Sequence, residues 1–282
     1  MSKTSIRTTQ LPSGETVPIL GQGTWHMGED ADRRQDELAA LRLGLDLGLT
    51  LIDTAELYGS GASEHLIGEA IAGRRDEAFL VSKVLPPHAT LRGTISACES
   101  SLRRLRTDHL DLYLLHWRGQ VPLAQTLEAF ETLAKSGKIR HWGVSNFDVN
   151  DIEELLSLKS DANVATNQVL YNLVHRGIEF DLLPFCRQRH IPLMAYSPIE
   201  QGQLLESRQL HKIAARHHAT PAQIALAWVL RHDDIIAIPK AGTPDHLREN
   251  RDALNIQLTQ EDLSDLDNTF PPPTEKIPLE MI

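Results

Sequence analysis

The feature that most constrains the fold is an alternation, repeated eight times, of short apolar segments with longer amphipathic ones. Short apolar runs are typical of buried strands, and apolar residues three or four positions apart are typical of helices. Ile95, Cys98, Leu102 and Leu105, for example, recur at helical spacing. Strands that alternate with helices pair in parallel through right-handed crossovers. Eight such units in 282 residues predict the α/β class and a (β/α)8 TIM barrel.

The predicted boundaries follow from this pattern. Strands are expected at residues 17–21, 50–55, 78–84, 110–117, 141–146, 164–169, 192–198 and 235–240. Helices are expected at 35–48, 63–72, 91–105, 123–136, 150–158, 179–190, 221–231 and 258–266, and another helix begins near Thr243 and Pro244. Residues 6–10 and a segment near Val17 predict a β-hairpin, which we expect to cover the barrel end opposite the active site. No linker-like segment interrupts the chain, so a single domain over 1–282 is predicted.

Composition excludes several classes of function. Lys and Arg number 28 against 38 Asp and Glu, a net charge of −10, which argues against binding nucleic acid or an anionic membrane. No apolar stretch approaches the roughly 18 residues of a membrane helix, and the polar start resembles no secretory signal. Cys98 and Cys186 are too few for a disulfide framework. We therefore expect a cytoplasmic monomer that acts on a small molecule.

Polar residues end almost every predicted strand, and in a parallel barrel these ends form the active-site face. They are Asp53, Lys83, His116, Ser145, Asn146, Gln168, Tyr196, Ser197 and Lys240. Strand parity places Lys83 and His116 on apolar faces, where a charge needs a partner. Asp53 is a candidate partner for Lys83, and Tyr58 lies in the loop that follows Asp53.

These four groups suit the reduction of a carbonyl group. A free tyrosine has a pKa of about 10, and we expect a neighbouring ammonium to lower it. A carboxylate would hold the lysine charged and oriented, and an imidazole would orient the carbonyl oxygen. The set can then deliver a proton to an oxygen that gains negative charge.

The motifs that carry these residues resemble the aldo-keto reductase family, and the match covers most of the chain. They are Gly21-Gln22-Gly23-Thr24-Trp25, DTAELYGSGASEHLIGEA (53–70), LVSKV (80–84), LDLYLLHW (110–117), GVSNF (143–147), TNQVLYN (166–172), AYSPI (195–199) and IPKAGTPDHLREN (238–250). The similarity is greatest to bacterial reductases of small aldehydes such as methylglyoxal.

The resemblance implies roles for individual residues. Asp53, Tyr58, Lys83 and His116 would be catalytic, with Tyr58 as the proton donor, and Trp25 and Trp117 would line the substrate pocket beside Tyr58 and His116. A nicotinamide cofactor would be bound by Gly23, Thr24, Asp53, Ser145, Asn146, Gln168, Tyr196, Ser197, Pro198, Ile199, Gln201, Gly202, Lys240, Ala241, Gly242, Thr243, His246, Glu249 and Asn250. No metal is expected.

The chain departs from the family pattern at the adenosine end. His246 replaces the arginine that usually faces the 2′-phosphate, and Ala241 stands where a hydroxyl residue is common. Lys240 and the start of the helix at Thr243 still favour an anion. We therefore expect NADPH as cofactor, with NADH possible, and a preference that strengthens as pH falls. The short C-terminal segment after Lys240 predicts an open mouth and a broad range of small carbonyl substrates.

Parts of the sequence also fit two other functions. A nicotinamide-binding regulatory subunit with little turnover would fit the same fold, because fold alone does not determine function. A metal-dependent hydrolase could recruit some of the 13 histidines, but neither an HxH on the first strand nor an HExxH motif is present. Gly21-x-Gly23 lacks the third glycine of a Rossmann fingerprint.

Overall fold

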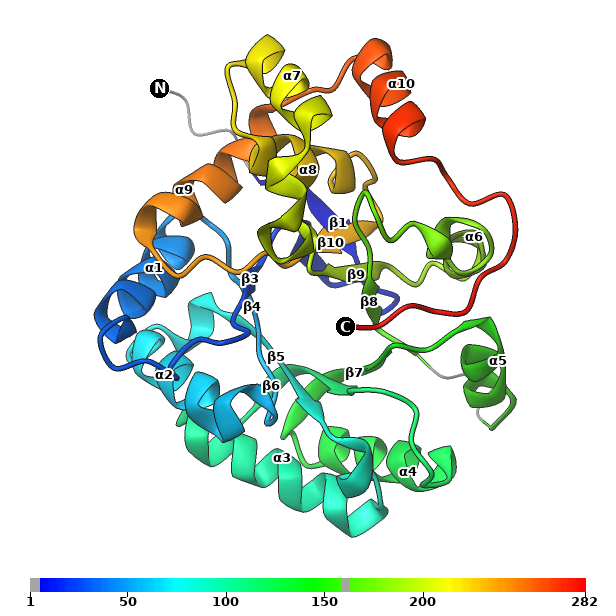
Figure 1. Ribbon diagram of the computed structural model, residues 1–282. Coiled ribbons are helices and arrows are strands. Elements are labelled where there is room, and N and C mark those ends of the chain that lie inside the picture. The colour runs from blue at the N-terminus through cyan, green and yellow to red at the C-terminus, as the bar shows by residue number, and fades with distance from the viewer. Residues whose placement is uncertain (1–5, 159–162) are drawn as a thin grey trace.

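The computed structural model describes residues 6–158 and 163–282 and contains one parallel sheet of eight strands. The strands are β3 (Gln22–Gly23), β4 (Leu51–Asp53), β5 (Phe79–Val84), β6 (Leu110–Leu115), β7 (Ile139–Ser145), β8 (Asn167–Leu170), β9 (Leu193–Tyr196) and β10 (Ile235–Ala237). Neighbours in the sheet follow chain order, and every pair is parallel. Helices surround the sheet (Figure 1).

The first and last strands of this sheet meet, so the sheet closes into a barrel. Parallel bridges join Leu20 to Ala237 and Gly23 to Lys240. The Gly23 N–H donates to the Pro239 carbonyl at 3.0 Å. A Cβ at Gly23 would lie 2.4 Å from the Ile238 carbonyl oxygen, so this close approach requires glycine. The predicted TIM barrel is confirmed.

The predicted first strand, residues 17–21, is wrong. Thr16–Pro18 forms β2, which pairs antiparallel with β1 (Thr8–Gln10), and the first barrel strand begins only at Gln22. Apolar residues run without interruption through the change from hairpin to barrel, so hydrophobicity alone does not reveal the break.

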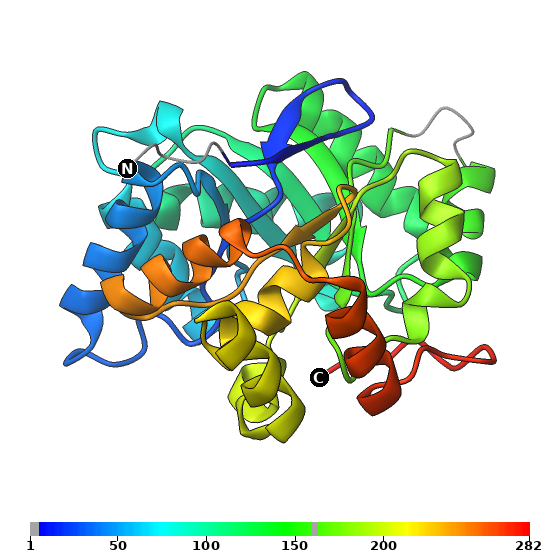
Figure 2. The ribbon, with the colours of Figure 1, turned by 90° about the horizontal axis from the view of Figure 1, so that it is seen from above.

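The hairpin of β1 and β2 covers the end of the barrel where the parallel strands begin. Leu11 and Val17 belong to the same buried cluster as Leu51 and Phe79, which begin β4 and β5. Figure 2 shows the hairpin in dark blue at the top, with the C-terminus on the opposite side of the molecule. The predicted position of the hairpin is confirmed.

Ten α-helices lie in the part of the chain that the structure describes. They are α1 (Arg34–Asp46), α2 (Ala62–Ala70), α3 (Leu91–Leu105), α4 (Leu123–Lys135), α5 (Val149–Leu158), α6 (Leu182–Gln188), α7 (Arg208–His217), α8 (Pro221–Val229), α9 (Pro244–Asp252) and α10 (Gln260–Thr269). Only α7 was not predicted. It buries just Leu210, Ile213 and Ala214, and so short an apolar face is a weak signal of a helix.

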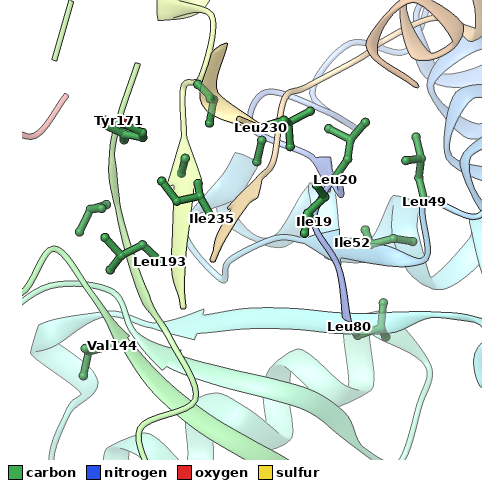
Figure 3. Close-up of a cluster of buried hydrophobic side chains, with 14 of the residues drawn as sticks. Ile19, Leu20, Leu49, Ile52, Leu80, Val144, Tyr171, Leu193, Leu230 and Ile235 are labelled. Carbon is green, nitrogen blue, oxygen red and sulfur yellow. The ribbon is translucent and has the colours of Figure 1, made fainter. Parts of the chain in front are cut away.

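Apolar side chains pack on both faces of the barrel strands. Figure 3 shows the larger cluster, with Ile52, Leu80 and Val144 among its members. A second cluster contains Val81 and Leu114, which alternate along their strands with members of the first. Two residues after Val81 comes Lys83, and two residues after Leu114 comes His116, so each continues the same strand face, as strand parity predicted. Both are buried at the carboxyl end of the barrel.

Two sequence-based expectations reach beyond what is described. The polar start that argued against a secretory signal includes residues 1–5, which lie outside the described residues, and the predicted domain limits include these residues too. Among residues 6–158 and 163–282, no helix is long and apolar enough to cross a membrane.

Candidate active site

The ammonium of Lys83 on β5 is the central group at the carboxyl end of the barrel. It is fully buried and donates to Asp53 Oδ2 at 2.9 Å, to the Thr54 carbonyl at 2.8 Å and to Tyr58 Oη at 3.0 Å. An ammonium has three N–H groups, and all three are used. The position and charge of Lys83 are thereby fixed, and the predicted pairing with Asp53 is present in the structure.

Tyr58 and Trp25 lie next to this ion pair. Tyr58 begins a short 3-10 turn, Tyr58–Gly61, and the tyrosine itself is only 8% exposed. Its ring packs edge-to-face against Trp25 at 4.9 Å between ring centroids. Trp25 itself is 44% exposed, so an aromatic surface faces solvent beside the phenol.

His116 and Trp117 approach the phenol from the other side. His116 follows β6, and its ring centroid lies 6.0 Å from that of Tyr58 and 4.9 Å from that of Trp117. Its Nδ1 is buried and has no hydrogen-bond partner among the described residues. Burial, with a smaller contribution from Lys83, lowers the pKa of His116 to about 2. The imidazole is therefore neutral, a state in which it can hydrogen-bond to an oxygen but carries no extra proton to give.

Burial also determines the state of the other three groups. It raises the pKa of Tyr58 and outweighs the opposing effect of Lys83, so the expectation of a lowered tyrosine pKa is wrong. Burial opposes the charge of Lys83, but Asp53 and Tyr58 together raise its pKa above the usual value. The pKa of Asp53 is raised by burial, while Lys83 and Gln168 oppose that rise. Tyr58 is consequently a protonated phenol held against a charged ammonium.

A second set of side chains extends the network across β7, β8 and β9. Gln168 Nε2 donates to Asp53 Oδ1 at 2.7 Å, and Ser145 Oγ donates to the Gln168 carbonyl at 2.9 Å. Asn146 Nδ2 donates to the His116 carbonyl at 3.1 Å, and Tyr196 Oη donates to Asn146 Oδ1 at 3.0 Å. The structure thus brings these four predicted nicotinamide-binding residues together with the catalytic candidates.

The remaining predicted cofactor residues lie around the rim. Thr24 Oγ1 donates to the Asp53 carbonyl at 2.8 Å, next to Gly23 at the end of β3. Ser197, Pro198, Ile199, Gln201 and Gly202 form the turn after β9, where Ser197, Gln201 and Gly202 have positive φ. Lys240, Ala241, Gly242 and Thr243 connect β10 to α9, and His246, Glu249 and Asn250 lie on α9. Among the described residues, neither of these two groups forms a hydrogen bond to the side chains of the candidate catalytic residues.

Thr243 caps α9, as predicted, because its Oγ1 accepts from the His246 N–H at 3.3 Å. Arg248, two residues beyond His246, pairs with Asp245 at 3.1 Å on the exposed surface. It is therefore not directed toward Lys240.

Two groups at the site were not predicted. The Thr54 carbonyl is one of the three acceptors around Lys83, and a backbone group leaves no sequence signal. Arg33, just before α1, lies beside Lys240 and Gly242 in space, although about 200 residues separate them. A single arginine before a helix gives no indication of such a contact.

Comparisons with known proteins agree with this architecture. A sequence model of the Aldo/keto reductase family matches residues 19–269. The chain is 50% identical to "Methylglyoxal reductase YeaE" of Escherichia coli, covering 97% of this chain and 98% of that protein. It is 36% identical to "Glyoxal reductase" of Bacillus subtilis, covering 94% and 93%. A crystal structure of an aldo-keto reductase from Klebsiella pneumoniae in complex with NADPH has a TM-score of 0.96 and 49% identity, covering 99% and 100%.

Proposed function

The chain belongs to the aldo/keto reductase family, and we propose that it reduces small aldehydes with NADPH and with Tyr58 as the proton donor. Membership confirms the predicted family and the predicted class of enzyme, an oxidoreductase acting on carbonyl groups. The choice of substrate and the roles of individual residues are the proposal.

The observation that carries the proposal is the hydrogen bond from Lys83 Nζ to Tyr58 Oη at 3.0 Å. Because the phenol oxygen accepts from the ammonium, its own hydrogen is left to donate elsewhere. As a substrate oxygen gains negative charge, Tyr58 donates this proton to it. Lys83 stabilises the phenolate that results, and Asp53 holds Lys83 in place.

The residues present suit a nicotinamide cofactor that is phosphorylated on its ribose. The Arg33 guanidinium and the Lys240 ammonium both come close to Gly242, where a Cβ would crowd them, and two neighbouring cations suit a phosphate. Ser145, Asn146 and Gln168 would hold the carboxamide, and Tyr196 would lie against the ring. The bound cofactor supplies the hydride, and the buried polar network around Asp53 keeps the reacting groups in position.

Small, unhindered carbonyl compounds are the substrates we propose, with α-oxoaldehydes such as methylglyoxal foremost. Two relatives are named for the reduction of methylglyoxal and glyoxal. Tyr58 and His116 are buried and would contact the reacting carbonyl, whereas the exposed Trp25 would leave room for varied substituents. The backbone of Ile282 lies close enough to Tyr196 to oppose the rise in the pKa of its phenol, so the last described residues border this side of the site.

The structure offers no specific support for a regulatory subunit without turnover. Such a protein would need the cofactor contacts but not a buried lysine that directs a phenol into the mouth. We further propose that the barrel forms a single domain and acts as a cytoplasmic monomer, and sedimentation at micromolar concentration tests the monomer.

A turnover panel tests the proposed function. Methylglyoxal, glyoxal, an aromatic aldehyde and a simple ketone are each offered with NADPH and with NADH. We expect the highest kcat/KM for a small aldehyde, and a higher kcat/KM with NADPH than with NADH. Cofactor binding without turnover on any carbonyl compound would instead support the regulatory subunit.

A further inference from the structure

Gly242, in the turn between β10 and α9, is flanked by two cationic side chains. A Cβ built on Gly242 would lie 2.9 Å from a terminal guanidinium nitrogen of Arg33 and 3.4 Å from Lys240 Nζ. Arg33 is the residue that precedes α1, so it comes from a different part of the chain than Lys240. The two cations therefore converge on a residue without a side chain, where a Cβ would crowd the guanidinium.

Nothing in the described part of the chain neutralises this pair. Among the described residues, neither the side-chain ammonium of Lys240 nor the guanidinium of Arg33 has a hydrogen bond or an ion pair. Burial and then Arg33 lower the pKa of Lys240, while Glu37 and Glu29 oppose this at a distance. Glu29 contacts His26, and Glu37 Oε2 accepts from the Gly28 N–H at 2.8 Å. Neither carboxylate bridges the two cations.

Two neighbouring cations without a counter-charge suit an anion with several oxygens. A guanidinium presents a planar fork that matches two phosphate oxygens, and an ammonium adds a point charge. We propose that Arg33 binds the 2′-phosphate of NADPH together with Lys240, and that it supplies the guanidinium absent at His246. This inference rests on the proposed function, because it assigns a residue to the cofactor of that reaction.

The other arginine close in sequence to His246 cannot take this part in the observed structure. Arg248 is 55% exposed and pairs with Asp245, which is 92% exposed. Arg33 and Arg248 thus provide a matched comparison. Both are surface arginines near the start of a helix at this rim, and only Arg33 converges on Lys240.

Direct binding to the intact protein tests the proposal without measuring turnover. Isothermal titration calorimetry gives Kd for NADP⁺ and for NAD⁺ with wild type, Arg33→Ala, Arg33→Lys and the control Arg248→Ala. For Arg33→Ala we expect Kd for NADP⁺ to rise about tenfold, the size of one lost charged hydrogen-bonding group, with Kd for NAD⁺ unchanged. Arg33→Lys should give a smaller rise, because it keeps the charge but loses the fork. Arg248→Ala should change neither Kd.

Binding of two smaller nucleotides tests whether Arg33 contacts the 2′-phosphate. Adenosine 2′-monophosphate should bind less tightly to Arg33→Ala than to wild type, whereas adenosine 5′-monophosphate should not distinguish the two. An equal loss for NADP⁺ and NAD⁺ would place Arg33 at the pyrophosphate and overturn the assignment, as would no change for either. Failure of the proposed function would look different: wild type would bind NADP⁺ with the Arg33 dependence described and still reduce no carbonyl compound.

Discussion

Lys83 and Lys240 both lie at the carboxyl end of a barrel strand, but their surroundings are opposite. Lys83 is fully buried and its three N–H groups have three acceptors. Lys240 is half-buried beside Arg33 and has no recorded partner in the described chain. A cation whose donors are all used can only position its neighbours. A cation with free donors is available for an anionic ligand, so under the proposed function Lys83 would serve the reacting end of the site and Lys240 the end that anchors the cofactor.

Removing Lys83 should have the largest effect, because it disturbs both folding and reaction. Lys83→Met leaves the buried carboxylate of Asp53 with Gln168 as its remaining side-chain donor. Loss of one partner of a buried ion pair costs about 3–5 kcal/mol. We expect that decrease in the free energy of unfolding from urea titrations at pH 7, together with loss of turnover.

A double variant provides the control for this result. Lys83→Met with Asp53→Asn removes both charges, so part of the lost stability should return while turnover stays absent. A single variant as stable as wild type would contradict the view that Lys83 and Asp53 form a buried charged pair.

The phenol of Tyr58 is the next most sensitive group, and its loss should act on the reaction alone. Tyr58→Phe keeps the ring that packs on Trp25 but removes the proton donor. We expect kcat to fall about 10²–10⁴-fold, the usual contribution of a general acid. Kd for NADPH, measured by calorimetry, should stay within about twofold of wild type. Unchanged turnover would assign the proton to another donor.

Lys240→Met should have a smaller effect, confined to binding. One charged contact to the phosphate is lost, so Kd for NADPH should rise about tenfold, and Kd for NADH should change little. The free energy of unfolding should fall by less than about 0.5 kcal/mol, because no partner loses its charge compensation. A destabilisation as large as that of Lys83→Met would remove the distinction between the two lysines.

The barrel could be predicted from the sequence because hydrophobic periodicity indicates which residues are buried, and burial determines where strands and helices form. The prediction of elements was wrong where this periodicity is ambiguous. The apolar run before Gln22 spans two elements, and α7 has a short apolar face. Strand parity and strand ends did predict the placement of Lys83 and His116, which the structure buries together at the carboxyl end of the barrel.

Long-range and backbone contacts were beyond such reasoning. Arg33 reaches Gly242 only through the packing of α1 beside α9, which no local pattern encodes. The net effect of burial on Tyr58 was likewise missed, because the cost of removing a phenolate from water depends on the whole surrounding structure. The neighbouring ammonium alone suggests the opposite direction.

Because the pKa of Tyr58 is raised and that of His116 is lowered, we expect neither group to titrate near neutral pH. Burial raises the pKa of Tyr58 above 10, so the phenol keeps its proton at neutral pH and loses it only as pH rises through that higher value. The pKa of His116 is lowered to about 2, so the imidazole stays neutral as pH falls toward 6. The reductive kcat at saturating NADPH, measured with a stable aromatic aldehyde, should therefore vary by less than about twofold between pH 6 and pH 9. Arg248→Ala, far from the phenol, should give the same flat profile. A kcat that instead rises as pH falls through 7 would show that a group titrating near neutral pH supplies the proton, and would contradict the assignment of Tyr58 as the donor.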